Sequence, residues 1–344
     1  MSLQIRRADT PDDGWQALAR ECGSFYHEPA WSALLSREFR FHIEYLTAHD
    51  GDRLAGILPL ARVRGLARSR LVSLPFSYAV GPVARDHDTV LALLTYALAL
   101  AKGEGRALEI KSLAPDVPPA PGYTRRETYS TYLVDMSGGE TAVFERLHAG
   151  STRRSIKKAL KSNLAVTTET SVESWLAFAK LQEATSHGHG LPAPPRSFFV
   201  DGCRGLAEHG LASLRLARLE GVPVAGIVLW QGARQWIYAF GASRPDALEA
   251  RPNHLLIWRA IVDAIHAGVG FDLGRASPQQ EGLVEFKQRW GAQAVPLAYD
   301  YWPEPRGLNT LPRDRGALAL LGRVWSHLPE PVARAGSVLY RYLA

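Results

Sequence analysis

Hydrophobic and polar positions recur along the chain in a pattern that predicts two copies of one strand–turn–strand unit. Residues 51–60 align without a gap with residues 221–230, so that the first glycine, an Ala-Gly-Ile triplet and the apolar positions coincide. Apolar runs precede both segments and the glycines suit a tight turn, which predicts a hairpin in each copy. Pro59 and Pro223 suit the start of a strand or an edge strand rather than a central position in a sheet.

The similarity resumes further along in a helix and a short strand. Each copy continues with a helical pattern, a glycine and a short apolar strand, with a one-residue shift between helix and strand. Glu109 and Asp272 occupy the same place in the two short strands. Because two matches occur in the same order, we expect residues 46–110 and 214–273 to share one topology. Two copies are too few for a solenoid, so the order of elements favours α+β organisation.

The repeat divides the chain into two units and a tail. We place the first domain at residues 1–140 and the second at 141–302, with a turn-rich stretch at the join. Residues 303–344 carry apolar residues at helical spacing, which predicts an amphipathic helix packed on the body of the protein. The alternative is peripheral contact with a membrane through this helix, which contains Trp325 and basic residues.

Composition and charge are those of a mildly basic globular protein. The chain has 344 residues, of which 46% are hydrophobic and 22% charged, and its net charge of +6 favours anionic partners such as phosphates, RNA or an acidic lipid surface. An inert basic surface is the alternative. Two cysteines, Cys22 and Cys203, make no disulfide framework, which favours a cytoplasmic location, including the inner face of the membrane. We identify no signal peptide, and the longest near-apolar run, residues 90–101, is shorter than the ~20 residues that span a bilayer.

Motifs of the common nucleotide-dependent and hydrolytic enzymes are missing. The sequence contains no GxSxG elbow, Walker A loop, GxGxxG, HExxH or CxxC motif. The one close histidine pair, His187 and His189, has no further ligands at metal spacing, so no metal is predicted.

Polar residues of the second unit carry the candidate chemistry. Asn253 caps a predicted helix that follows an aromatic strand containing Tyr238, an arrangement that aims backbone N–H groups at a phosphate or an oxyanion. A plain capped helix is the alternative. The strand with Asp272 ends in a polar loop that contains Arg275 and Ser277, and loops at strand ends often hold functional sites.

Two cationic features complete the candidates. Lys287 lies at the edge of an apolar helical stripe, as a surface lysine or as a cation held over a site. Residues 151–161 predict a basic helix on which Arg154, Lys157, Lys158 and Lys161 share one face. That face is either solvated or binds an anion such as a tRNA backbone, a CoA phosphate or a lipid pyrophosphate.

These strings together resemble the Fem-like branch of the GNAT superfamily, including members found beside polysaccharide-export genes. The matching strings are, in order, residues 25–31, 58–60, 74–76 with 81–83, 153–154 with 157–159, 189–192, 238–243, 252–256, 271–275 and 286–291. The resemblance covers about residues 24–302. It implies two tandem GNAT-like domains, with mixed sheets flanked by helices, and acyl transfer to an amine bound between or across the halves.

The resemblance also implies roles for single residues. Lys287 would polarise the acyl carbonyl, and Arg153 or Arg154 would lie near the donor. Apart from the resemblance, we expect Asp272 or Glu109 to receive the amine proton, unless both carboxylates are structural partners of nearby arginines. The catalytic candidates are therefore Lys287 and Asp272. The donor-binding candidates are Arg153, Arg154, Lys157, Lys158 and Asn253. The acceptor-binding candidates are Tyr238, Arg275, Ser277 and His189.

One departure from the GNAT pattern concerns the acyl donor. GNAT acetyltransferases carry an R/Q-x-x-G-x-G/A loop for the CoA pyrophosphate, and residues 238–253, where it should lie, do not contain it. The donor is accordingly acyl-CoA or aminoacyl-tRNA. We expect transfer of an acyl or aminoacyl group to a primary amine of a cell-envelope or exopolysaccharide precursor. The alternatives are a non-catalytic GNAT-fold adaptor in exopolysaccharide assembly and an RNA-binding module, against which the modest charge argues.

Overall fold

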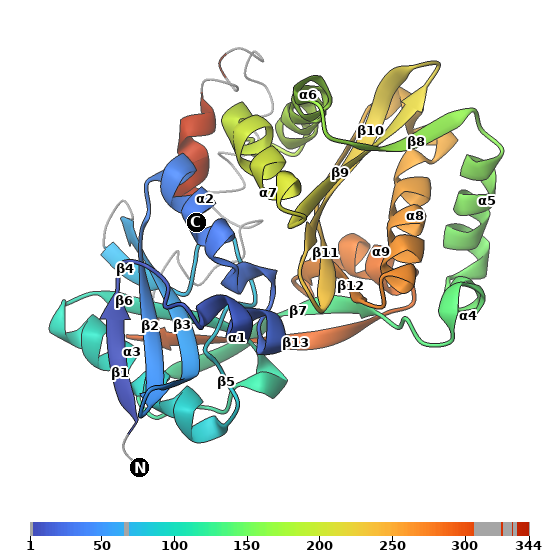
Figure 1. Cartoon of the computed structure of the whole chain (residues 1–344). Helices are drawn as coiled ribbons and strands as arrows, with labels where there is room; N and C mark the ends of the chain where they lie inside the picture. Colours follow the sequence, from blue (N-terminus) through green and yellow to red (C-terminus); the bar gives the residue numbers. More distant parts are fainter. Residues whose placement is uncertain (1–2, 65–68, 306–324, 326–331, 333–335, 344) are drawn as a thin grey trace.

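The computed structural model of the chain describes residues 3–64, 69–305, 325, 332 and 336–343 (Figure 1). The first half contains two central antiparallel strands, a long helix and the strands around them. Its elements are β1 (Gln4–Ala8), α1 (Trp15–Cys22), η1 (Phe25–His27), α2 (Pro29–Phe39), β2 (His42–Asp50), β3 (Arg53–Arg64), β4 (Ser69–Val72), β5 (Val83–Ala84), α3 (His87–Gly103), β6 (Ala107–Leu113), η2 (Ala114–Asp116) and β7 (Thr124–Val134).

The second half repeats this order with additional helices. Its elements are α4 (Gly139–Arg146), η3 (Ala149–Arg153), α5 (Arg154–Leu160), β8 (Leu164–Glu169), α6 (Val172–Gly188), η4 (Phe198–Cys203), α7 (Arg204–Glu208), β9 (Ala212–Leu219), β10 (Val222–Gln231), β11 (Gln235–Ser243), η5 (Pro245–Ala250), α8 (Pro252–His266), β12 (Gly270–Ala276), α9 (Glu281–Gln288) and β13 (Ala292–Trp302). Near the C-terminus, η7 (Gly336–Leu343) is a 3-10 helix. Most of the predicted C-terminal amphipathic helix lies outside the described residues.

The two halves share one topology, as the repeat predicts. In the first half, β1, β2, β3 and β4 pair in turn as antiparallel neighbours, and β4 pairs in parallel with β6 across α3. In the second half, β8, β9, β10 and β11 pair in the same way, and β11 pairs in parallel with β12 across α8. The prediction of a duplicated α+β unit is therefore confirmed.

Matching glycines explain why the sequence repeat shows in the fold. Gly51 and Gly221 turn the two hairpins with φ of 61° and 81°, a left-handed conformation that a side chain would strain. Gly56 and Gly226 lie where a helix packs closely against the strand. A Cβ at either position would come within 2.7 Å of a neighbouring side-chain carbon.

The last strand of each half is exchanged with the other half. The described strands form one continuous sheet with the order β1-β2-β3-β4-β6-β13-β7-β12-β11-β10-β9-β8, and β5 pairs with β3 beside this path. Strand β7 ends the first half but pairs with β12 of the second, whereas β13 ends the second half and pairs with β6 of the first. These two strands also pair with each other. The predicted domain limit at residue 140 thus follows a strand that extends the sheet of the second unit.

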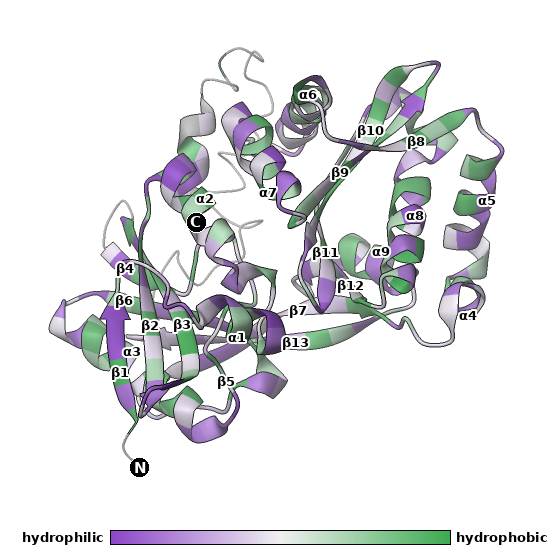
Figure 2. Cartoon of the chain, viewed as in Figure 1, coloured by the Kyte–Doolittle hydropathy of each residue, from purple (hydrophilic) through white to green (hydrophobic). Residues whose placement is uncertain are grey.

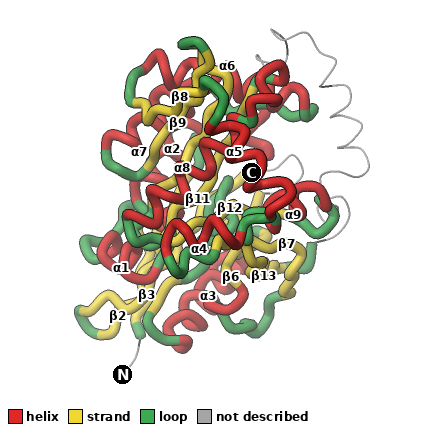
Figure 3. The backbone as a smooth tube through the Cα atoms, turned by 90° about the vertical axis from the view of Figure 1, so that its right-hand side faces the viewer, coloured by secondary structure: helices red, strands yellow, loops and turns green. Residues whose placement is uncertain are grey.

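Helices cover both faces of this sheet. In Figure 1, α6 and α7 lie on one side of β9 and β10, and α8 lies on the other with α5 outside it. Figure 3 shows α4, α5 and α8 together on the side that faces the viewer. The edge strand β1 is largely hydrophilic while β3 is largely hydrophobic (Figure 2), which suits an edge that must not pair with other chains.

The hydrophobic core of the protein joins the two halves. One buried cluster lies under α3 and another under α8. A third combines residues of α1, α2 and η1 with residues of α6, η4 and β10. At its centre Phe25 stacks on Trp230 with 5.0 Å between ring centroids and 7° between the planes. Each buried aromatic side chain contributes about 1.5–3 kcal/mol through burial, so this shared core fixes the relative position of the halves.

Two sequence expectations about helices have definite outcomes. Asn253 does not cap α8: Arg251 is the N-cap residue, in a left-handed conformation with φ of 60°, Pro252 is the first helical residue, and no side-chain capping bond forms. The apolar run at residues 90–101 belongs to α3. Within the part of the chain that the structure describes, no helix has both the length and the apolar character needed to cross a bilayer.

Candidate active site

The candidate site lies where the parallel strands β11 and β12 separate. The two strands pair only where Gln235–Ile237 of β11 lies beside Gly270–Asp272 of β12. Beyond this point β11 bends at a register shift opposite Val228 and Leu229. Strand β12 has a register shift of its own between Asp272 and Arg275, where it pairs with β7. The backbone groups of residues 273 and 274 are consequently released from regular strand pairing.

Asp272 lies at this point and is held by three hydrogen bonds. Its side chain is buried, with 2% of the residue exposed. It accepts hydrogen bonds from the Tyr78 hydroxyl at 2.7 Å, the Thr131 hydroxyl at 2.5 Å and the Gly274 N–H at 2.7 Å. Burial raises the pKa of Asp272, and the three donors oppose that rise. Glu109, the alternative proton acceptor, instead pairs with Arg70 at 3.0 Å.

Two tyrosines from the first half extend the Asp272 cluster. Tyr78 lies in the loop between β4 and β5, and Tyr26 lies in η1. Their rings meet edge to face with centroids 5.3 Å apart. Burial, followed by the nearby Asp272 charge, raises the pKa of both hydroxyls well above the usual value. Both hydroxyls therefore stay protonated, and the Tyr78 hydroxyl links the first half of the protein to Asp272.

Lys287 is a buried lysine that binds the backbone released by β12. Only 4% of the residue is exposed, so the interpretation as a surface lysine is wrong. Its ammonium donates to the carbonyls of Leu273 at 2.6 Å, Gly274 at 2.5 Å and Arg275 at 3.1 Å, and lies 5.4 Å from the centroid of the Tyr132 ring. Burial lowers the pKa of Lys287 to about 8. An ammonium has three N–H donors, and here each has a carbonyl acceptor.

The loop after Asp272 contributes a second polar cluster. Arg275 donates to the Tyr299 hydroxyl at 3.0 Å, and its guanidinium carbon lies 4.4 Å from the centroid of the Tyr129 ring. Both tyrosines belong to the exchanged strands, β13 and β7. Ser277 is buried, and its hydroxyl bonds Gln279 of its own loop. Of these two predicted acceptor residues, Arg275 contacts tyrosines of β7 and β13, whereas Ser277 stabilises its own loop.

The remaining acceptor candidates and Asn253 lie on other elements. Asn253 donates to the Ser243 hydroxyl at 3.2 Å, and its buried carbonyl oxygen has no hydrogen-bond partner. Burial raises the pKa of Tyr238 to about 12. The backbone carbonyl of Tyr238 and the Lys287 ammonium both lie within 4 Å of where a Cβ on Gly274 would be. His189 is exposed at the C-terminal end of α6, and among the described residues its ring contacts neither Asp272 nor Lys287.

The basic helix is present and lies beside the loop that precedes α8. Arg154, Lys157, Lys158 and Lys161 are exposed, while Ile156 and Ala159 on the opposite side are buried. Lys158 forms an ion pair with Glu249 of η5 at 3.2 Å, and Arg153 keeps a buried Nε atom without a partner. Three of the four cations therefore have no acidic partner within the described residues.

Sequence reasoning missed the contribution of the first half and of the exchanged strands. Tyr78, Thr131, Tyr129 and Tyr299 were not candidates, because no short-range pattern places them beside Asp272. Tyr26 lies within residues 25–31, one of the strings that carry the Fem-like resemblance. That string was the sequence signal that pointed to a functional residue in the first half. Among the described residues, no group of three or more potential metal ligands comes together, and Cys22 and Cys203 are free thiols.

Comparison with known proteins identifies the fold of these halves. A family model described as an acetyltransferase (GNAT) domain matches residues 148–288. The crystal structure of FemX superposes with a TM-score of 0.69 at 16% identity, covering 86% of this chain and 96% of that one. The C-terminal domain of a putative lysylphosphatidylglycerol synthetase from Agrobacterium fabrum gives 0.52 at 14% identity, covering 90% and 94%. A tandem GNAT protein from the clavulanic acid biosynthesis pathway gives 0.52 at 12% identity, covering 89% and 100%. No curated protein sequence matches the chain.

These findings confirm the fold prediction. Residues 148–288 match the GNAT acetyltransferase domain, and the chain as a whole shares the fold of a tandem GNAT protein and of FemX. The GNAT match supports the prediction that the chain is an acyltransferase enzyme. It includes Asp272 and Lys287, whereas Tyr26, Tyr78 and Thr131 lie outside it. The roles of all these residues stay predictions.

Proposed function

We propose that the chain is an N-acyltransferase that transfers an acyl or aminoacyl group to a primary amine of a cell-envelope or exopolysaccharide precursor. The observation that carries this proposal is the contact between Asp272, at the point where β11 and β12 separate, and Tyr78 of the other half. A site assembled from both halves suits a reaction that brings two large substrates together. The GNAT match over residues 148–288 supports the reaction class.

In the proposed reaction the amine nitrogen attacks the acyl carbonyl carbon. The new C–N bond gives a tetrahedral oxyanion, and the amine proton moves to Asp272, directly or through the Tyr78 hydroxyl. The oxyanion then collapses: the bond from the acyl carbon to the carrier breaks, and the carrier leaves with the bonding electron pair and takes the proton from Asp272. Lys287 assists by exchanging its longest hydrogen bond, the 3.1 Å contact to the Arg275 carbonyl, for the developing oxyanion. Arg275 and Tyr238 line the acceptor side, Ser277 holds the loop beside them, and His189 would contact only a more distant part of a large acceptor.

The donor end of the site favours aminoacyl-tRNA over acyl-CoA. A helix N-terminus binds phosphate through its free N–H groups, but at α8 Pro252 has none, and the N–H groups of His254 and Leu255 already bond the Arg251 carbonyl. Only the Asn253 N–H is left in the first turn. The basic helix with Arg153, Arg154, Lys157 and Lys158 offers a longer cationic face, which suits the repeated phosphates of an RNA backbone.

A second candidate function is a non-catalytic adaptor with the GNAT fold. The observation that favours it is that all three N–H donors of Lys287, and both carboxylate oxygens of Asp272, already have hydrogen-bond partners within the fold. An adaptor would keep these bonds as supports of the fold and would accept no acyl donor.

A transfer assay separates the two functions. The purified chain is incubated with a pool of aminoacyl-tRNAs or with acyl-CoAs, together with amine-bearing acceptors: a nucleotide-linked muramoyl peptide and a glucosamine oligosaccharide. The added mass on the acceptor is then measured. We expect transfer with aminoacyl-tRNA, and a loss of ~10²-fold or more in Asp272→Asn and in Tyr78→Phe, the range for removing a general base. Matched controls are Asp52→Asn and Tyr342→Phe, at exposed positions. Normal transfer by folded Asp272→Asn would contradict the proposed roles, and no transfer with any donor would favour the adaptor.

A further inference from the structure

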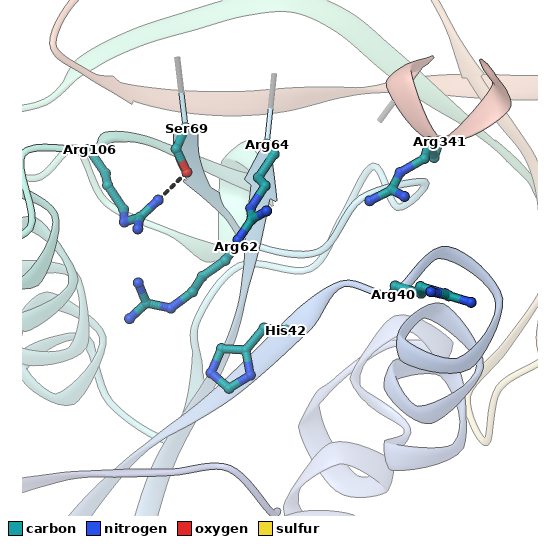
Figure 4. Close-up of a pocket in the computed structure, with 7 residues that line it drawn as sticks. All are labelled: Arg40, His42, Arg62, Arg64, Ser69, Arg106 and Arg341. Atoms are coloured by element: carbon teal, nitrogen blue, oxygen red, sulfur yellow. Dashed lines mark hydrogen bonds between the residues drawn. The ribbon is translucent and has the colours of Figure 1, made fainter. Parts of the chain in front are cut away.

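The first unit holds an arginine-rich pocket separate from the candidate active site. The pocket has a volume of about 390 Å³ (Figure 4). It is lined by Arg40, His42, Arg62, Arg64, Ser69, Arg106 and Arg341. None of these residues belongs to the Asp272 and Lys287 clusters, and neither the family match nor the proposed reaction assigns them a role.

Strand pairing brings several of these side chains to one edge of the first sheet. His42 lies directly opposite Arg62 across β2 and β3, and Arg64 lies directly opposite Ser69 across β3 and β4. Cross-strand partners project on the same face of a sheet, so all four side chains share a face. Arg106 reaches the same place from the start of β6 and donates a hydrogen bond to Ser69. The pocket is therefore built by the fold rather than by one flexible loop.

The ends of α2 and of the chain complete the pocket. Arg40 follows the last turn of α2 with φ of 56°, a left-handed conformation that is uncommon for arginine. Arg341 belongs to η7. Its neighbour Tyr340 stacks on Phe76, with 4.8 Å between ring centroids and 19° between planes, and also meets Phe39 at 5.9 Å. These aromatic contacts fix the segment that carries Arg341 against the body of the protein.

The cations of the pocket fall into two groups. Arg62 is neutralised by Glu44 and Glu104, each at 2.6 Å, and Arg106 lies 2.9 Å from Glu104. By contrast, Arg40, Arg64 and Arg341 have no carboxylate partner in the described ranges 3–64, 69–305 and 336–343. Side chains of like charge that line one pocket repel each other, which favours occupation of such a pocket by an anion.

We propose that this pocket binds a ligand that carries two adjacent phosphate groups. The guanidinium fork matches phosphate oxygens in pairs, and all cationic side chains that line the pocket other than His42 are arginines. Three arginines without acidic partners suit a ligand with about two or three negative charges. The pocket volume is in the range of small-molecule sites, about 300–1,000 Å³, which leaves room for part of the group esterified to the phosphates.

Direct binding measurements on the full chain test this proposal without reference to acyl transfer. The probes are inorganic pyrophosphate and uridine diphosphate, as soluble sources of the diphosphate, and farnesyl pyrophosphate, as a lipid source. The pocket variant is Arg40→Ala with Arg64→Ala. Both residues are exposed and form no ion pair with any residue that the structure describes, so the variant should fold as the parent does. The control variant, Arg6→Ala with Arg53→Ala, removes the same charge from exposed positions outside the pocket.

We expect titration calorimetry to show that the parent binds the diphosphate probes and that the pocket variant binds them at least tenfold more weakly. The control variant should change the Kd by less than twofold. Equal binding of all three probes would show that the diphosphate alone is recognised, and preference for the farnesyl ester would show a lipid-linked ligand. Failure of the parent to bind any probe would overturn the proposal, as would equal weakening in the two variants. Neither result bears on the acyl-transfer site.

Discussion

Replacing Lys287 by methionine tests the structural account of the candidate site most directly. Methionine keeps an unbranched side chain of similar length but cannot donate hydrogen bonds. The change leaves the carbonyls of Leu273, Gly274 and Arg275 without their present donor. An unsatisfied buried polar group costs about 1–3 kcal/mol, so three of them would cost roughly 3–9 kcal/mol before any compensation.

The burial cost of the ammonium offsets part of this loss. The pKa of Lys287 falls from 10.5 to about 8, which at about 1.4 kcal/mol per unit corresponds to roughly 3 kcal/mol against the charged form. Removing the charge recovers this amount. Subtracting this from the roughly 3–9 kcal/mol leaves a net loss of roughly 0–6 kcal/mol, so we expect Lys287→Met to lower the free energy of unfolding by about 3 kcal/mol at pH 7, the middle of that range.

The same pKa predicts how the difference between the two proteins changes with pH. Between the folded pKa of about 8 and the unfolded pKa of about 10.4, the unfolded chain binds more protons than the folded chain. Deprotonation of Lys287 then stabilises the parent as pH rises, and the variant lacks this gain. The stability gap should stay constant below pH 8 and widen by about 2 kcal/mol between pH 7 and pH 9.5. Other titrating groups cancel in the difference.

Urea unfolding followed by circular dichroism, at pH 7 and pH 9.5, measures both quantities. Equal stability of parent and variant at both pH values would refute the assignment of three hydrogen bonds to Lys287. A gap that does not widen by pH 9.5 would refute its lowered pKa. A separate transfer assay measures catalysis: a lysine that also binds the oxyanion should lose ~10²–10³-fold in kcat on substitution, with little change in KM.

Two further predictions concern the basic helix and the packed glycines. Arg154→Ala with Lys157→Ala should weaken binding of aminoacyl-tRNA at low salt and reduce the slope of log K against log salt by about 1.5, since each phosphate contact contributes roughly 0.7–0.9. The double variant Arg6→Ala with Arg53→Ala, measured beside it by filter binding, should keep the slope of the parent. An unchanged slope in the helix variant would show that this face is solvated and does not bind RNA. Gly56→Ala and Gly226→Ala should each lower the free energy of unfolding by about 1–3 kcal/mol, because the added Cβ would come within 2.7 Å of a side-chain carbon. Gly103→Ala, where a Cβ would meet nothing within 4 Å, is the control, and thermal unfolding that fails to separate it from the other two would contradict the packing argument.

The sequence by itself determined the repeated unit, because the signals that specify it are local. Gly51 and Gly221 set the hairpin turns through a backbone conformation that depends on one residue. Gly105 and Gly268 end α3 and α8 with φ of 63° and 70° in the same way. Alternating and helical spacing of apolar residues identified the buried faces. Each of these features involves residues close together in the chain, which a single sequence displays directly.

The position of Lys287 shows where local patterns stop being informative. Helical spacing placed it at the edge of an apolar stripe, but periodicity gives the direction of a side chain and not the depth at which it lies. Its burial depends on the register shift between Asp272 and Arg275 in β12, which frees the carbonyls that it binds. The prediction that Asn253 caps α8 was wrong for a related reason. Arg251, in a left-handed conformation, is the N-cap residue, so α8 begins at Pro252 and Asn253 already lies inside the helix.

Only the tertiary structure decided how the two copies are joined. A strand's own residues fix its faces, but its neighbours in the sheet are set by which edges remain open once the other elements have packed. The sequence of β7 therefore did not show that it pairs with β12, nor that of β13 that it pairs with β6. The contact between Tyr78 and Asp272 joins residues 194 positions apart in the chain, and it exists because the exchanged strands and the shared core bring the two halves together.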